Sequence, residues 1–130
     1  MKPMHITLPA RQLNAADFAA YGEVLALSNT NGLPINAGTS QRIDLPCQLD
    51  LHQQGGQPVL AVFRARAQDT QGPWQLLERH RLGTQTFVPL AGARCVVLVA
   101  LGDHAPDPAT LAAFQVAGDQ GFTLYADTWH

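Results

Sequence analysis

Three side chains in one short stretch of the chain could share a reaction or a metal ion: Glu78, His80 and Gln85. Glu78 and His80 are two residues apart, so on a β-strand their side chains point to the same face. Gln85 lies beyond the turn Leu82-Gly83 and can return to that face from the next strand. A carboxylate, an imidazole and an amide that converge in this way can coordinate a divalent cation. They can also combine an acid–base pair with an orienting group.

The stretch from Gly72 to Gly92 has a spacing similar to that of the first cupin motif, Gly-x5-His-x-His-x4-Glu-x6-Gly. Glu78 stands in the place of the first histidine, and Gln85 stands in the place of the glutamate. The alternative interpretation is an exposed strand whose polar face happens to contain Glu and His. The two glycines and three ligand positions that fall in register favour the motif.

Composition and charge exclude several other classes of protein. The net charge is -2, with 8 Lys+Arg against 10 Asp+Glu, so there is no basic footprint for nucleic acid. No apolar run reaches the roughly 20 residues that span a bilayer, and the first residues lack the apolar region of a signal peptide. Serine is scarce, and no nucleophile elbow, P-loop or paired-cysteine zinc spacing occurs. Cys47 and Cys95 are expected to be free thiols in a reducing cytoplasm.

The elements that must position these side chains are predicted to form one domain over residues 1–130. Apolar and alternating runs predict strands at residues 6–8, 23–27, 42–45, 48–52, 58–67, 74–80, 84–90 and 94–101, with a last strand after the turn at 118–121. Two short helices are predicted, at 15–21 with Asn14 as N-cap, and at 107–114, begun by Asp107 and Pro108. Many short strands with two brief helices are typical of a β-sandwich or small barrel.

Several separated blocks of the sequence occur together in one known family. They are residues 18–24 (Phe-Ala-Ala-Tyr-Gly-Glu-Val), 36–39 (Asn-Ala-Gly-Thr), 77–80 (Leu-Glu-Arg-His), 83–90 (Gly-Thr-Gln-Thr-Phe-Val-Pro-Leu) and 128–130 (Thr-Trp-His). In this order they resemble the ureidoglycolate lyase family, also called ureidoglycolate hydrolase, of the cupin superfamily. The resemblance runs from Phe18 to His130. It implies a mainly β fold, a cupin-like double-stranded β-helix or jelly-roll barrel with two short helices, and a homodimer.

The resemblance also implies a reaction. Ureidoglycolate would be converted into glyoxylate and urea, late in the catabolism of allantoin and purine nitrogen. The C–N bond breaks as the carbinol oxygen loses its proton and becomes a carbonyl. The site therefore needs a base for the hydroxyl, an acid or polarising group for the ureido nitrogen, and donors for the substrate carboxylate.

The residues can be assigned to these needs in more than one way. His80 or His130 is the candidate general base, because imidazole commonly exchanges protons near neutral pH. Glu78 either takes the proton itself or holds the imidazole tautomer. The candidate substrate-binding residues are Arg42 for the carboxylate, Gln85 for the urea amide, and Asn36 in the block that precedes Arg42. Arg42 has the alternative of a salt bridge with Asp44.

A divalent metal, Ni²⁺ or Mn²⁺, is a candidate cofactor, and an acid–base site without metal is the alternative. The candidate ligands are Glu78, His80, Gln85 and His130. The metal would polarise the carbinol oxygen. The replacement of two usual cupin ligand types by Glu78 and Gln85 leaves both alternatives open.

The sequence departs from the family pattern at several positions. Proline is common in the place of Arg81, and Gly or Asn in the place of Asp127. Family members continue past Trp-His with another His-Pro-Leu and further strands, whereas this chain stops at His130. We therefore expect missing C-terminal strands, an exposed sheet edge, and a site that is open or completed by a partner subunit. Arg79 and Arg81 are expected to be solvated, and Trp129 to belong to the core.

Two other functions fit the same residues. One is a non-catalytic or degenerate cupin module that binds a small carboxylate. The other is a metal-dependent cupin enzyme of different specificity, such as an isomerase or oxygenase. Release of urea from ureidoglycolate, with and without a chelator, distinguishes these functions from the lyase.

Overall fold

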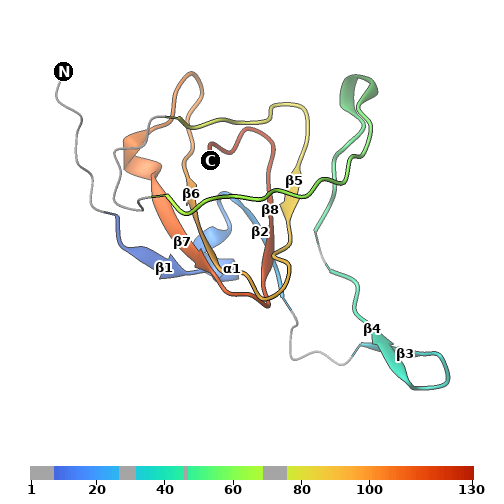
Figure 1. The fold of residues 1–130 in the computed structure, drawn as a ribbon. Helices are drawn as coiled ribbons and strands as arrows, with labels where there is room; N and C mark the ends of the chain where they lie inside the picture. Colours follow the sequence, from blue (N-terminus) through green and yellow to red (C-terminus); the bar gives the residue numbers. More distant parts are fainter. Residues whose placement is uncertain (1–7, 27–31, 46, 69–75) are drawn as a thin grey trace.

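Two three-stranded sheets face each other, and the C-terminus of the chain lies between them (Figure 1). The computed structural model describes residues 8–26, 32–45, 47–68 and 76–130. The sheets have the orders β1-β7-β6 and β2-β8-β5, and β3-β4 is a separate hairpin. The strands are β1 (Ala10–Gln12), β2 (Gly22–Leu25), β3 (Leu33–Ile35), β4 (Ser40–Arg42), β5 (Gln85–Phe87), β6 (Cys95–Val99), β7 (Ala112–Val116) and β8 (Gly121–Leu124).

The core lies between the two main sheets because their inward residues are large and apolar. In β7, Phe114 and Val116 are each 1% exposed, whereas Gln115 between them is exposed. Phe18 belongs to the only α-helix of the described ranges, α1 (Ala15–Phe18). The Phe18 ring meets the rings of Phe114 in β7 and Phe122 in β8 edge-on, with 5.3 Å and 5.8 Å between ring centroids. These edge contacts join the helix to both sheets.

The first predicted helix is confirmed in a shorter form. Asn14 is its N-cap as expected, because the Asn14 side-chain oxygen accepts a hydrogen bond from the Asp17 N–H at 2.9 Å. The second predicted helix, 107–114, is wrong beyond its first turn. Asp107 caps a 3₁₀ turn, η2 (Pro108–Thr110), and the chain then continues as β7. A strand buries alternate residues of 112–116 in the core, which outweighs the local helix signal.

Three of the predicted strands are not formed among the described residues. Residues 48–52 and 58–67 contain no strand, and η1 (Gln53–Gly55) lies between these two segments. Residues 76–80, the described part of the strand predicted at 74–80, also contain no strand. Val59 and Leu60 are 81% and 103% exposed. The segment 58–68 crosses the front of the molecule without pairing (Figure 1). A strand needs a neighbouring strand for its backbone hydrogen bonds, and alternation alone does not supply one.

Other predicted strands are present with different bounds. The strands predicted at 23–27, 42–45, 84–90 and 94–101 overlap β2, β4, β5 and β6. The last predicted strand is present in part as β8, followed by a bridge between Ala100 and Trp129. Most of the strand at 6–8, the start of the one at 74–80 and most of the turn at 28–32 fall outside the described residues.

The architecture is mainly β and consistent with a cupin-like fold. Within the described ranges no strand pairing joins the two main sheets, so β1 and β6, and likewise β2 and β5, are sheet edges. No helix in the same ranges is long and apolar enough to cross a membrane. Cys47 and Cys95 are both free, as expected.

Candidate active site

Glu78, His80 and His130 come together in the structure. One ligand atom from each side chain lies within 4.8 Å of the other two. Glu78 Oε1 is 3.7 Å from His130 Nε2, and the two imidazole centroids are 5.4 Å apart. The His130 side chain is 12% exposed and that of Glu78 is 63% exposed. The cluster therefore has a buried side at His130 and a side open to solvent at Glu78.

Backbone hydrogen bonds bring His130 to the segment that carries the other two residues. The Glu78 N–H donates to the His130 carbonyl and the His130 N–H donates to the Glu78 carbonyl, both at 2.9 Å. The Asp127 N–H donates to the His80 carbonyl at 2.8 Å. On the other side, Trp129 pairs with Ala100, next to the end of β6. The last residues thus run between β6 and the segment 78–80.

The orientation of the His130 ring fixes which of its nitrogens is free. Nδ1 lies 3.1 Å from the Thr128 carbonyl oxygen. That oxygen can only accept a hydrogen bond, so Nδ1 carries the hydrogen of the neutral ring and Nε2 carries the lone pair. Nε2 is buried and has no hydrogen-bond partner within the part of the chain that the structure describes. A buried lone pair beside a carboxylate and a second imidazole fits either a divalent cation or a substrate proton.

Gln85, the first residue of β5, faces the same side of its sheet. Phe87 lies two residues further along the strand, and its ring meets that of His130 with 6.4 Å between centroids. Residues two apart in a strand share a face, so Gln85 also points toward the His130 side. Its Oε1 is buried and unpartnered among the described residues. Gln85 therefore offers a free acceptor or a further metal ligand.

The structure does not bring Arg42 and Asn36 to the cluster within one chain. Both lie in the β3-β4 hairpin, which projects away from the main sheets (Figure 1). Arg42 Nε is 2.8 Å from Asp44 Oδ1, the alternative pairing anticipated from the sequence, and the side chains are 65% and 78% exposed. Asn36 lies in the hairpin turn, where its carbonyl accepts a hydrogen bond from the Thr39 hydroxyl at 2.7 Å. Their substrate-binding roles stay predictions.

Arg79 is not solvated, contrary to the expectation from the sequence. Its side chain is 11% exposed, and its guanidinium lies over the half-buried Trp129 ring, 4.4 Å from the ring centroid. The alternation that places Glu78 and His80 on one face places Arg79 on the other, and this signal was available in the sequence. Arg81 is solvated as expected, with a side chain 63% exposed, and lies 3.5 Å from the Asp127 carboxylate.

A cavity of about 340 Å³ borders the cluster at His80. Asp50, Thr84 and the turn at 53–56 line it. The Thr84 N–H donates to the Asp50 carbonyl at 2.9 Å, and the Asp50 N–H donates to Thr84 Oγ1 at 3.0 Å. The sequence predicted the turn but not its place beside His80, because these contacts join segments that are far apart in the chain.

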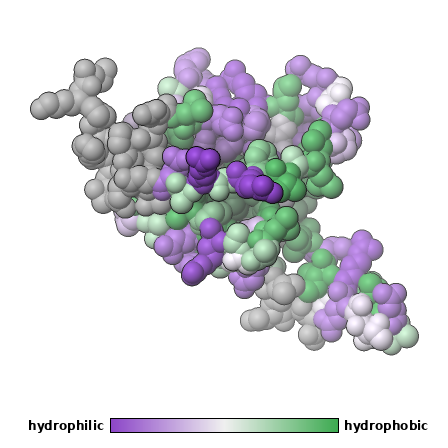
Figure 2. Space-filling view, viewed as in Figure 1, coloured by the Kyte–Doolittle hydropathy of each residue, from purple (hydrophilic) through white to green (hydrophobic). Residues whose placement is uncertain are grey.

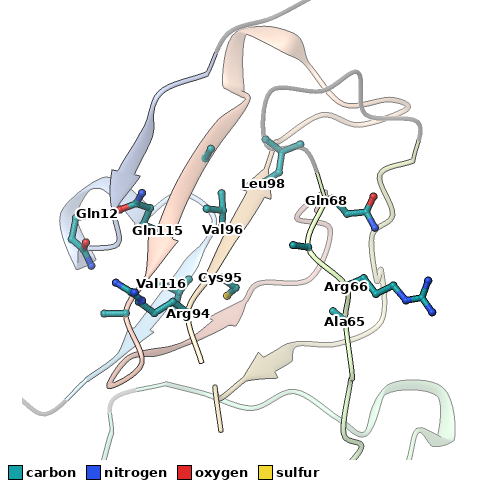
Figure 3. A pocket seen from close by; sticks show the side chains of 13 residues that line it. Gln12, Ala65, Arg66, Gln68, Arg94, Cys95, Val96, Leu98, Gln115 and Val116 are labelled. Carbon is teal, nitrogen blue, oxygen red and sulfur yellow. The ribbon is translucent and has the colours of Figure 1, made fainter. Parts of the chain in front are cut away.

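A larger cavity of about 890 Å³ lies away from the cluster, over the outer face of the β1-β7-β6 sheet (Figure 3). Val96 and Leu98 of β6 line it opposite the extended segment that carries Ala65 and Gln68, and the Arg66 side chain points away from it. Among the described residues, its lining contains no carboxylate or imidazole. Its described lining therefore offers none of the proton-transfer and ligand groups of the cluster.

The fold and the cluster together define a class of protein. It is a mainly β, cupin-like protein with a site suited to acid–base or metal-assisted chemistry on a small molecule. The family model described as "Ureidoglycolate lyase" matches residues 5–130. The chain belongs to the ureidoglycolate lyase family.

Individual relatives agree with this assignment. The ureidoglycolate lyase of Burkholderia cepacia is 34% identical over 125 residues, which cover 95% of this chain and 70% of that protein. That of Burkholderia mallei (strain NCTC 10229) is 35% identical over 125 residues, covering 95% and 72%. That of Escherichia coli (strain SMS-3-5 / SECEC) is 36% identical over 118 residues, covering 91% and 73%.

Proposed function

We propose that this protein is a ureidoglycolate lyase, which converts ureidoglycolate into glyoxylate and urea. Family membership indicates the substrate. The observation that carries the proposal is the convergence of Glu78, His80 and His130 around a buried, unpartnered imidazole nitrogen. The comparisons do not favour a carboxylate-binding module or a cupin enzyme of another specificity.

His130 is the best-placed general base in a site without metal. Its Nε2 takes the proton of the substrate hydroxyl, and the electron pair left on oxygen forms the glyoxylate carbonyl as the C–N bond breaks. The Thr128 carbonyl accepts a hydrogen bond from Nδ1, which keeps the ring in the required tautomer. The Glu78 carboxylate, with Oε1 3.7 Å from Nε2, lies beside the nitrogen that receives the proton.

The ureido nitrogen must gain a proton as it leaves. His80 adjoins His130 and borders the 340 Å³ cavity, so in its protonated form it can donate to a leaving group bound there. Gln85 Oε1 accepts an N–H of the ureido group in this arrangement, which gives the buried oxygen the partner it lacks. The two residues thus assist the departure and the binding of urea.

Glu78, His80 and His130 are also the residues that would hold a divalent cation, Ni²⁺ or Mn²⁺, with Gln85 as a further candidate ligand. Two imidazoles and a carboxylate are a common donor set for such ions. A bound cation would polarise the carbinol oxygen. The single lone pair of His130 Nε2 cannot bind a cation and remove a proton at the same time. Metal binding by His130 and direct proton abstraction by His130 are therefore exclusive alternatives.

We also propose a cytoplasmic homodimer. Val59, Leu60, Val62 and Phe63 are 71% to 103% exposed. Figure 2 shows hydrophobic side chains interspersed with polar ones on the front of the molecule, where the segment 58–68 crosses in Figure 1. Exposed apolar residues gathered in one segment are typical of a protein interface. In such a dimer, Arg42 on the projecting hairpin is available to the site of a neighbouring subunit.

The two free cysteines agree with the reducing compartment of the proposed cytoplasmic location.

Replacement of His130 tests the proposed function. We expect His130→Ala to lower kcat for the release of urea and glyoxylate by about 100-fold or more, the usual contribution of a general base. His104→Ala is the matched control, because the His104 side chain is 96% exposed. Activity that EDTA abolishes and Ni²⁺ or Mn²⁺ restores would assign a metal role to the cluster. Activity that resists EDTA would assign direct proton abstraction. Wild-type protein that releases neither product, with or without metal, would contradict the proposal.

A further inference from the structure

The segments that carry the candidate ligands are also joined on the face opposite the Glu78–His80–His130 cluster. Arg79 lies between Glu78 and His80, and Trp129 precedes His130. Arg79 Cζ is 4.4 Å from the centroid of the Trp129 ring. Arg79 Nη1 and Trp129 Nε1 both donate to the Gly102 carbonyl oxygen, at 3.1 and 2.9 Å. One cation–π contact and one shared acceptor thus connect the two segments.

The Arg79 side chain is held in a single environment. It is 11% exposed, so its charge is largely removed from water, and such a charge requires partners in the protein. The Trp129 ring face and the Gly102 carbonyl provide two of these partners. The Asp127 carboxylate, 3.9 Å from Nη1, provides a third of opposite charge. These contacts fix the guanidinium and, through it, the backbone of residues 78–80.

The backbone contacts alone leave the cluster weakly constrained. Between the two segments, Glu78 and His130 share one pair of hydrogen bonds, and Asp127 bonds to the His80 carbonyl. So short a ladder resists twisting poorly. Any twist between the segments would change the 3.7 Å separation of Glu78 Oε1 and His130 Nε2 on the other face. A contact on the opposite face that joins both segments opposes such a twist.

We propose that Arg79 is a positioning residue of the candidate active site. Through Trp129 and the Gly102 carbonyl, it sets the relative position of Glu78, His80 and His130. It touches neither the substrate nor a metal ion in this role. The inference deepens the proposed function, on which it rests for its kinetic readout only, because the positions of the two imidazoles can be measured without substrate.

The experiment compares Arg79→Met with Arg81→Met. Arg81 is two residues further along and also lies near Asp127, but its side chain is 63% exposed. Each full-length variant is examined by ¹H–¹⁵N NMR of the histidine side chains without metal, by calorimetric titration with Ni²⁺ or Mn²⁺, and by urea release. We expect Arg79→Met to shift the His80 and His130 imidazole signals. We also expect it to lower kcat for urea release by about 10- to 100-fold, which is the usual effect of losing a residue that orients metal ligands. Arg81→Met should match wild type within about twofold.

Arg79→Lys separates the guanidinium from its charge. Lysine keeps the charge but lacks the planar fork that can stack on Trp129 while it donates to Gly102, so it should restore at most part of kcat. If Arg79→Met does not fold, Arg79→Lys and Trp129→Phe decide the question by the same imidazole signals. Wild-type imidazole signals and kcat in the folded variants would overturn the proposal. If wild-type protein releases no urea, the proposed function fails, while the imidazole signals still test the positioning role.

Discussion

A neutral imidazole has one donor nitrogen and one acceptor nitrogen, so the partner of Nδ1 decides what Nε2 can do. In His130 the Thr128 carbonyl occupies Nδ1 and leaves Nε2 as a buried acceptor. His80 is exposed, and no such contact assigns its tautomer among the described residues. From the sequence, His80 and His130 were equal candidates for the general base. The orientation of the His130 ring distinguishes them, because it leaves Nε2 free to accept a proton.

Gln85→Met tests the buried amide oxygen at the same scale. A buried acceptor without a partner costs about 1–3 kcal/mol, so the apolar side chain of similar length should raise the free energy of unfolding by about 1 kcal/mol. The same change should raise KM for ureidoglycolate, because the ureido group of the substrate loses the Gln85 oxygen as hydrogen-bond acceptor. Guanidinium denaturation and initial-rate kinetics measure the two effects. Gln115→Met, on an exposed position of β7, is the control. A less stable Gln85→Met with unchanged KM would show that the amide serves the fold alone.

Two departures from the family pattern contact each other. Asp127 has φ 70°, in the left-handed region where Gly and Asn are favoured, as in the residues that the family pattern led us to expect there. Arg81, in the place of proline, lies 3.5 Å from the Asp127 carboxylate. The ion pair is exposed and contributes little to stability.

At the scale of elements, the site depends on how β8 is placed between β2 and β5. β5 begins with Gln85 and pairs with β8, and β8 pairs with β2 through Gly22 opposite Leu124. A Cβ at Gly22 would collide with the backbone carbonyl of Thr123 and lie 3.0 Å from the Phe18 ring. The close approach of β2 to β8 thus requires glycine at this position.

Gly22→Ala is therefore expected to destabilise the fold by about 3 kcal/mol, the upper range for overpacking against atoms that cannot move. Gly92→Ala is the matched control, because a Cβ there meets nothing within 4 Å and only the φ of 69° opposes it. That conformation costs an alanine about 1–2 kcal/mol. Chemical denaturation compares the two variants. Equal destabilisation would mean that β2 can move away from β8 at little cost.

Local signals predicted elements well where they concern one turn or one strand. Asn14 and Asp107 cap the turns they were expected to cap. Local signals failed where contacts with another element decide whether a segment becomes a helix, a strand or neither. Residues 112–114 looked helical but lie in β7 between β1 and β6, and residues 58–67 alternate like a strand but have no partner among the described strands. Pairing and burial depend on contacts distant in sequence, which no local pattern contains.

At the scale of the whole molecule, the exposed segment around Leu60 predicts self-association. Leu60 is 103% exposed, so Leu60→Glu leaves the core intact while it places a charge in the proposed interface. Light scattering after size-exclusion chromatography should give about twice the 14.0 kDa chain mass for wild type and about one chain mass for Leu60→Glu. Gln57→Glu, also exposed, is the control and should stay dimeric. A monomeric wild-type protein at micromolar concentration would contradict the proposed homodimer.

The sequence by itself determined the mainly β class and the family, and it predicted that Glu78 and His80 lie together, because composition, motif order and residue spacing are local properties. The family resemblance named His130 as a partner of these residues. The tertiary structure brings it to them, leaves its Nε2 as the free nitrogen, and buries Arg79 against Trp129. Each of these depends on the backbone pairing of residues 129–130 with Ala100 and Glu78. Such pairing is set by the packing of the whole sheet structure, so no single stretch of sequence specifies it.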